Sequence, residues 1–220
     1  LNVESSGEFA IFNVKLKTWQ VNEVRKNFTN IDNSDTFIEK PTQLGRELQL
    51  SHAYAPRGLR KIVYQNDSDG NALYGARDLT LLNGETEENK TQHSPIIGWA
   101  YDGNPIYGPF GYSDPDNINS DLKILTPSYT LDISNVVNRP TAFKEGFFID
   151  DYVYNGLGDL DSHNGRFCKT PEFPNGIYAY FASVGISSAT SKLEGVYPYF
   201  IGNTYRSPFI TENQLLNQNF

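Results

Sequence analysis

The chain has 220 residues, a formal net charge of −8 and a single cysteine, Cys168. A chain of this length buries enough surface to fold without a metal, and one cysteine excludes an intrachain disulfide. The acidic surface argues against nucleic-acid partners, and no apolar run approaches the roughly 20 residues that span a bilayer, so we expect no membrane insertion.

Short β-branched and aromatic runs recur along the chain, bounded by Gly, Pro, Asn and Asp. No window sustains the apolar 3.6-residue period of a helix, whereas Val14, Leu16 and Thr18 alternate with lysines. We predict a mainly β chain: a single β-sandwich or barrel-like domain over residues 1–220, with long Gly/Pro-rich loops and little helix. Because methionine is absent even at position 1, we expect the chain to be part of a longer polypeptide. The predicted strand segments include VKLKTW (14–19), LRKIVY (59–64), IIGWAY (96–101), GFFIDDYVY (146–154), IYAYFASV (177–184) and VYPYFI (196–201).

The strand period of two predicts which side chains share a core. Alternate residues of a strand face the same side of the sheet. Applied to the segments above, this rule places five side chains in one core: Trp99, Ile106, Phe147, Tyr178 and Tyr180.

Residues 98–112 combine glycines and prolines with aromatic rings. These glycines and prolines favour stiff turns, which would hold Trp99 and Tyr107 at fixed angles. Exposed rings beside Asp102 and Asn104 would suit a sugar, whose apolar face stacks on a ring while polar groups bind its hydroxyls. The alternative, which we favour, is that the rings form the core.

A second group of polar residues lies in the Gly/Pro-rich segment 155–176: Asp159, Asp161, His163, Arg166 and Glu172. We treat Arg166 and Glu172 as further candidate ligand-binding residues.

We expect no bound cofactor, with calcium as the one exception that we keep, because Asp159 and Asp161 are spaced as calcium ligands often are. The alternative, which we favour, is that both carboxylates cap turns or pair with Arg166. We further expect the segment to be pinned by Phe167 and Phe173, with Cys168 buried.

The chain has three histidines, His52, His93 and His163. A zinc site needs three or four converging ligands, and none of the usual histidine spacings occurs. We therefore expect hydrogen-bonded histidines, and keep His93 and His163 as metal candidates in case folding brings them together. No nucleotide-binding glycine loop or serine hydrolase motif is present.

The blocks GWAYDGNPIYGPFGY (98–112) and DLDSHNGRFCKTPEFPNGIYAYFA (159–182) resemble the two motifs of the YHYH-domain family. The first motif matches over residues 102–108. The Tyr-His-Tyr-His signature falls on residues 178–181, which read Tyr-Ala-Tyr-Phe, and Arg166 stands where much of the family has a histidine. A metal site carried by those histidines would lack these ligands here.

The longer sequence around these motifs is similar to the form found in large virion structural proteins of marine cyanobacterial phages. The similar segments include HSPIIGWAYDGNPIYGP, NGRFC and TPEFPNG. The resemblance implies a virion setting and supplies no established activity. Our leading hypothesis is a non-enzymatic module of a phage tail, baseplate or fibre, with other virion proteins or copies of itself as partners. The alternatives are a host-adhesion module that binds surface carbohydrate, and a metal-assisted hydrolase that uses His93, Asp161, His163 and Glu172.

Overall fold

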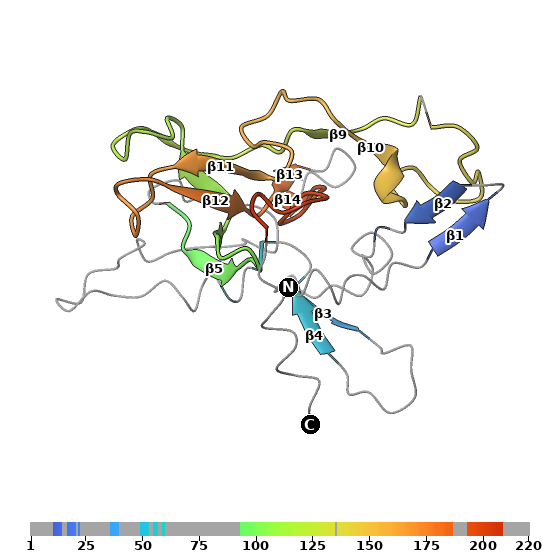
Figure 1. Ribbon diagram of the computed structural model, residues 1–220, viewed down its shortest axis with the longest axis horizontal. Coiled ribbons are helices and arrows are strands. Elements are labelled where there is room, and N and C mark those ends of the chain that lie inside the picture. The colour runs from blue at the N-terminus through green and yellow to red at the C-terminus, as the bar shows by residue number, and fades with distance from the viewer. Residues whose placement is uncertain are drawn as a thin grey trace.

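The computed structural model describes residues 11–14, 17–20, 22, 36–39, 49–52, 55–56, 59, 93–134, 136–186 and 193–208. Figure 1 shows short strands joined by long connections in these ranges. The prediction of a mainly β chain with little helix and long Gly/Pro-rich loops is confirmed. Nothing in the described ranges is a helix long and apolar enough to cross a membrane.

One four-stranded sheet joins the two motif blocks of the sequence. The first block contributes β5 (Ile96–Trp99) and β6 (Pro105–Tyr107), and the second contributes β11 (Gly165–Cys168) and β12 (Ile177–Phe181). The strand order is β11-β12-β6-β5, and the central pair β12 and β6 is parallel. Both outer pairs are antiparallel. The parallel pair is therefore the place where the two blocks meet.

The remaining strands of the described residues form antiparallel two-stranded sheets, and none of these sheets closes into a barrel. A two-stranded sheet is marginally stable alone, so each depends on packing against its surroundings. A 3-10 turn, η4 (Ile149–Asp151), directly precedes β10. The pairs are β1 (Ile11–Val14) with β2 (Lys17–Gln20), β3 (Thr36–Glu39) with β4 (Gln49–His52), β7 (Phe110–Tyr112) with β8 (Leu122–Ile124), β9 (Tyr129–Leu131) with β10 (Tyr152–Tyr154), and β13 (Val184–Ile186) with β14 (Leu193–Gly195).

Three predicted strands are wrong, wholly or in part. Within residues 146–154 only β10 is a strand of the sheet pairs, because the 3-10 turn η4 occupies residues 149–151. Residues 14–19 do not form one strand, because the chain reverses between Val14 and Lys17, which pair across a hairpin. Residues 197–200 form a turn in which Tyr199 has a left-handed backbone, with a φ of 70°. Pro198 has no N–H to donate to a strand ladder, which explains why this aromatic run leaves the sheet. The predicted strand at 59–64 lies outside the described residues apart from Leu59.

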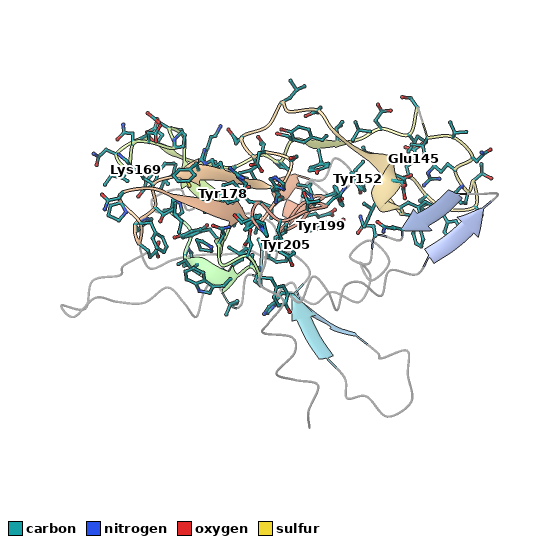
Figure 2. All side chains as sticks on the ribbon, in the orientation of Figure 1. Glu145, Tyr152, Lys169, Tyr178, Tyr199 and Tyr205 are labelled. Atoms are coloured by element: carbon teal, nitrogen blue, oxygen red, sulfur yellow. The ribbon has the colours of Figure 1, made fainter. Side chains whose placement is uncertain are left out.

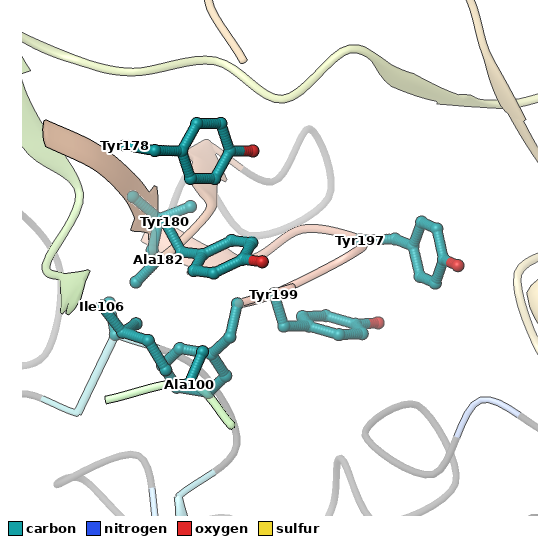
Figure 3. Close-up of a cluster of buried hydrophobic side chains, with 10 residues drawn as sticks. Ala100, Ile106, Tyr178, Tyr180, Ala182, Tyr197 and Tyr199 are labelled. Carbon is teal, nitrogen blue, oxygen red and sulfur yellow. The ribbon is translucent and has the colours of Figure 1, made fainter. Parts of the chain in front are cut away.

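The two faces of β12 enter two different apolar clusters. Tyr178 and Tyr180 pack with Ile106 on one face, which we call the tyrosine face. Ala179 and Phe181 pack with Tyr107 on the other, which we call the phenylalanine face. Figure 3 shows the tyrosine-face cluster, where rings from β12 and from the turn after β14 lie together. Its labelled members are Ala100, Ile106, Tyr178, Tyr180, Ala182, Tyr197 and Tyr199.

The prediction of one shared core is correct for Ile106, Tyr178 and Tyr180 and wrong for Trp99. The Trp99 side chain is 57% exposed. A bulge between Ile96 and Gly98 shifts the register, so Trp99 lies opposite Pro105. One extra residue turns every following side chain to the other face of a strand. Trp99 therefore projects on the face away from Ile106.

Phe147 was also assigned wrongly, because it packs in a third cluster around the buried Phe148. The buried carboxylate of Asp151 organises this region. Arg139 donates two hydrogen bonds to Asp151, from Nε at 2.7 Å and from Nη2 at 2.8 Å. The backbone N–H groups of Gly146 and Phe148 also donate to Asp151 Oδ2. The ion pair is thus fully hydrogen-bonded, the condition under which a buried pair is tolerated.

Candidate functional site

On the tyrosine face, hydrogen bonds connect β12 to the Asp102 carboxylate of the first motif block and to the segment after β14. Tyr180 Oη donates to Asp102 Oδ2 at 2.6 Å and accepts from the backbone N–H of Arg206 at 2.8 Å. The N–H groups of Ser207 and Asn104 donate to the Asp102 carboxylate as well. Burial, opposed in part by the Arg206 hydrogen bond, raises the pKa of Tyr180 well above its usual value. Tyr180 therefore remains a hydrogen-bond donor to Asp102.

Tyr178 makes the equivalent contact with Asp161. Its hydroxyl lies 2.9 and 3.0 Å from the two oxygens of that carboxylate. Asp161 Oδ1 also accepts from the backbone N–H groups of His163 and Gly165. The Arg206 guanidinium lies 5.6 Å from the centre of the Tyr178 ring, within the range of a cation–π contact. Burial and the Asp161 charge raise the pKa of Tyr178, so its proton is held in this bond.

His93 is buried against the phenylalanine face, with 2% of its surface exposed. Its ring centre lies 4.9 Å from that of Tyr107 and 5.8 Å from that of Phe181. Burial lowers the pKa of His93 to about 4, so the ring is neutral at pH 7. Its Nδ1 lies 2.8 Å from the carbonyl oxygen of Ser94, which can only accept. The proton is therefore on Nδ1, and the lone pair on Nε2 has no hydrogen-bond partner among the residues that the structure describes.

Arg166 is a cation whose charge adds to the lowering of the His93 pKa. Its Nη2 donates to the carbonyl oxygen of Tyr112, and its guanidinium carbon lies 5.6 Å from the centre of the Phe181 ring. Its Nε is buried and has no hydrogen-bond partner within the described ranges of the chain. Cys168, on the same strand, is buried as predicted. Burial raises the pKa of this thiol, although the guanidinium acts in the opposite direction.

Tyr107 connects the phenylalanine face to the turn at residues 170–176. Its hydroxyl lies 2.9 Å from Thr170 Oγ1 and 2.9 Å from Glu172 Oε2. Since a phenol has one proton and the carboxylate can only accept, Tyr107 donates to Glu172 and accepts from Thr170. Burial raises the pKa of Tyr107 to about 12 and also raises the pKa of Glu172.

The candidate ligand-binding residues divide into three places. Tyr107 and Glu172 meet, with Trp99 nearby through an edge-to-face contact to Phe173 at 6.5 Å. Asp102 and the backbone of Asn104 meet at the tyrosine face, and Arg166 lies against Phe181.

The candidate metal ligands are not brought together. Asp159 forms an ion pair with Lys123 and accepts from the backbone and hydroxyl of Thr126. His163 Nδ1 lies 2.9 Å from both the carbonyl and the hydroxyl oxygen of Thr204. Asp161 and His93 are engaged as described above. Across the ranges that the structure describes, no three His, Cys, Asp or Glu residues are grouped as a metal site.

The capping interpretation of these aspartates is correct in part. Asp161 caps the turn at His163, and Asp159 holds Thr126, but neither pairs with Arg166. Phe173 is half-buried, as expected for an anchor, whereas Phe167 is 69% exposed and was assigned wrongly. Phe167 lies on β11, an edge strand, which leaves one flank of its ring without neighbours.

The sequence did not point to Arg206 and Ser207, whose backbone N–H groups complete the tyrosine face. They lie 26 and 27 positions after Tyr180, in a segment without a strand or helix pattern. The pairing of tyrosines with aspartates was likewise not predicted, although the period of two already placed Tyr178 and Tyr180 on one face.

These features define a class of protein: a small mainly β domain in which a four-stranded sheet is locked by tyrosine–carboxylate hydrogen bonds. The family model described as YHYH protein matches residues 52–195, well over half of the chain. The chain therefore belongs to the YHYH family. No curated protein and no solved structure matches the sequence.

Proposed function

We propose that the chain is a non-enzymatic structural module that acts through protein–protein assembly. The observation that carries this proposal is the internal use of the motif side chains. Tyr178 donates to Asp161, and Tyr180 donates to Asp102. Tyr107 is hydrogen-bonded to Thr170 and Glu172. Side chains that satisfy each other within the chain stabilise a scaffold, since catalysis requires groups that face a substrate.

Exposed apolar side chains support the assembly role. Leu157 is 85% exposed and Val137 is 71% exposed. Exposed apolar side chains that gather on one surface often mark a contact with other proteins. The paired strands β9 and β10 carry three exposed apolar side chains, Leu131, Val153 and Tyr154. Other large apolar side chains that reach the solvent are Trp99, Tyr101, Ile118 and Phe167.

We place this module in a phage virion, as part of a tail, baseplate or fibre. The sequence of the motif blocks supports this setting, because it is similar to the sequence of virion structural proteins of marine cyanobacterial phages. Repeated copies of a weakly contacting module gain avidity from multivalency, so small contacts suffice in a particle. The partners would be neighbouring virion proteins or further copies of the chain.

Mass spectrometry of purified phage particles encoded by the same genome tests the setting, and lysine cross-linking of intact particles tests the assembly role. Lys144 and Lys169 suit this experiment because Lys144 is exposed and Lys169 is half-buried. Figure 2 shows Lys169 and Glu145 well apart along the ribbon, and Glu145 directly follows Lys144 in the sequence. We expect cross-links from these lysines to other virion chains or to second copies. Absence of the chain from particles would overturn the setting, and particles with intrachain cross-links only would overturn the assembly role.

A second measurement uses the isolated chain. If Leu157 and Val137 lie in a self-contact, L157D and V137D should lower the mass of the assembled species seen by light scattering. Thr130→Asp, at an exposed polar position of β9, is the matched control for an added charge. Equal effects of all three substitutions would argue against a contact at the apolar positions.

A further inference from the structure

Trp99 is a large ring held in solvent by the sheet. It ends β5, an edge strand of the four-stranded sheet, and is 57% exposed. Phe173 fixes it from one side, with ring centres 6.5 Å apart and ring planes at 84°. An edge-to-face contact leaves the flat face of one ring uncovered by the other. The structure therefore holds an indole in place without burying it.

The turn that supports Trp99 is rigid. Thr170 and Phe173 exchange two backbone hydrogen bonds of 3.2 Å, and Phe173 N also donates to Thr170 Oγ1. Gly176 N donates to the Phe173 carbonyl at 3.0 Å. Pro171 and Pro174 restrict the backbone on either side of Phe173. A surface that is ordered before binding loses little entropy when a ligand arrives.

A carboxylate is fixed on the same side of the sheet as Trp99. Trp99 lies opposite Pro105, and Pro105 and Tyr107 face the same way because they are two residues apart on β6. Tyr107 donates to Glu172 Oε2, and Glu172 directly precedes Phe173. Tyr107 Oη and the backbone N–H of Glu172 itself are the donors that the described residues offer to this carboxylate. A carboxylate has about four lone-pair sites, so this exposed side chain keeps room for further donors. An acceptor oxygen is thus available near the indole.

We propose that Trp99, Phe173 and Glu172 form a carbohydrate-binding subsite that takes one hexose unit of a polysaccharide. The apolar C–H face of the sugar stacks on the indole, and two neighbouring hydroxyl groups donate to the Glu172 carboxylate. A protein partner fits this surface less well, because carboxylates are depleted at the cores of protein interfaces. A sugar instead brings the hydroxyl donors that a held carboxylate can accept.

The residues of this subsite differ from the set predicted from sequence. Asp102 and Arg166 face other partners, whereas Phe173 joins the site. The subsite does not depend on the proposed assembly role: particle composition tests that role, and glycan binding tests the subsite. Either can therefore fail without the other.

A microarray of bacterial surface polysaccharides and neutral hexose oligomers, followed by calorimetry with the best binder, tests the proposal. Trp99→Ala should weaken binding about tenfold or more, as loss of a central aromatic contact does. Glu172→Gln keeps an acceptor for Tyr107 but loses the negative charge, and should weaken binding by a smaller factor.

The matched control is Phe167→Ala, which removes an aromatic ring that is also exposed, 69% by surface, on the opposite edge strand. The control should bind as the wild type does, and all variants should keep the wild-type circular dichroism spectrum. A wild-type chain that binds no glycan on the array overturns the proposal. So does equal weakening by Trp99→Ala and Phe167→Ala, or protection of Trp99 by a protein partner in place of a sugar.

Discussion

Both faces of β12 are packed with aromatic rings, but the polar groups buried on the two faces differ in how well they are hydrogen-bonded. On the tyrosine face, Tyr178 and Tyr180 each donate to a carboxylate, and backbone N–H groups complete the bonds. On the phenylalanine face, His93 and Arg166 each have a buried nitrogen to which no group of the described residues is hydrogen-bonded. Buried polar groups that are satisfied stabilise a fold, and unsatisfied ones destabilise it. We therefore expect the stability of the tyrosine face to depend more on hydrogen bonds, and that of the phenylalanine face to depend more on packing.

The largest expected effect concerns packing on the phenylalanine face. Phe181 is fully buried and contacts Tyr107, His93 and Arg166. Phe181→Ala should lower the free energy of unfolding by ~3–5 kcal/mol, because it removes a buried ring and leaves a cavity. Urea denaturation measures the loss, and Phe181→Leu, which retains most of the volume, should lose less. A loss under ~1 kcal/mol would show that packing does not hold this face together.

The second effect is a dependence of stability on pH that arises from His93. The unfolded histidine binds a proton below about pH 6.5, whereas the folded one stays neutral until the pH nears its pKa of about 4. Stability is therefore full above about pH 6.5 and falls as the pH drops toward 4, by about 3 kcal/mol in total.

His93→Gln, which cannot titrate, is the reference for this experiment. The difference in unfolding free energy between wild type and His93→Gln should shift in favour of the variant between pH 6.5 and 4. Parallel pH profiles would mean that the ring is not buried in neutral form.

The third effect tests the hydrogen bonds of the tyrosine face. Tyr180→Phe keeps the ring but removes the hydroxyl that donates to Asp102 and accepts from Arg206. The free energy of unfolding should fall by ~1–3 kcal/mol, the usual result when a buried partner is left unsatisfied. A double-mutant cycle with Asp102→Asn isolates the pair, and simple additivity of the two losses would contradict a direct bond.

The smallest effect concerns Trp99, which belongs to neither buried cluster. Because its side chain is 57% exposed, Trp99→Ala should change the free energy of unfolding by no more than about 1 kcal/mol. Thermal and urea unfolding both measure this change. A loss of ~3 kcal/mol or more would place the ring in the core and remove the platform proposed for carbohydrate.

The strand period of two predicted much of the sheet correctly. It gave the mainly β fold and the shared face of Ile106, Tyr178 and Tyr180. It failed at Trp99, because one bulged residue reversed the alternation, and a bulge has no dependable signal in the Ile-Ile-Gly-Trp run. It also failed at residues 197–200. The aromatic residues there suggested a strand, but Pro198 lacks the N–H that a strand ladder requires.

The candidate site was less predictable than the fold. The meeting of Tyr107 with Glu172 and that of Tyr180 with Asp102 span 65 and 78 positions of sequence. Such contacts depend on the parallel pairing of β6 with β12, which no local pattern specifies. Candidate residues with suitable chemistry could be identified from the sequence. Which of their side chains come into contact depends on the strand order of the sheet.

The segment that follows the family match has a consequence for where the folding unit ends. The match stops at residue 195, yet Tyr197, Tyr199 and Phe200 are buried in the tyrosine-face cluster. Asn22 donates to the Tyr199 hydroxyl at 2.9 Å, and its backbone N–H donates to the Phe147 carbonyl at 2.8 Å. A protease that cut after residue 196 would thus remove core side chains together with the N–H donors of Tyr180 and Asp102. Limited proteolysis should accordingly leave a resistant fragment whose C-terminal end lies beyond the matched region, at or after Ser207.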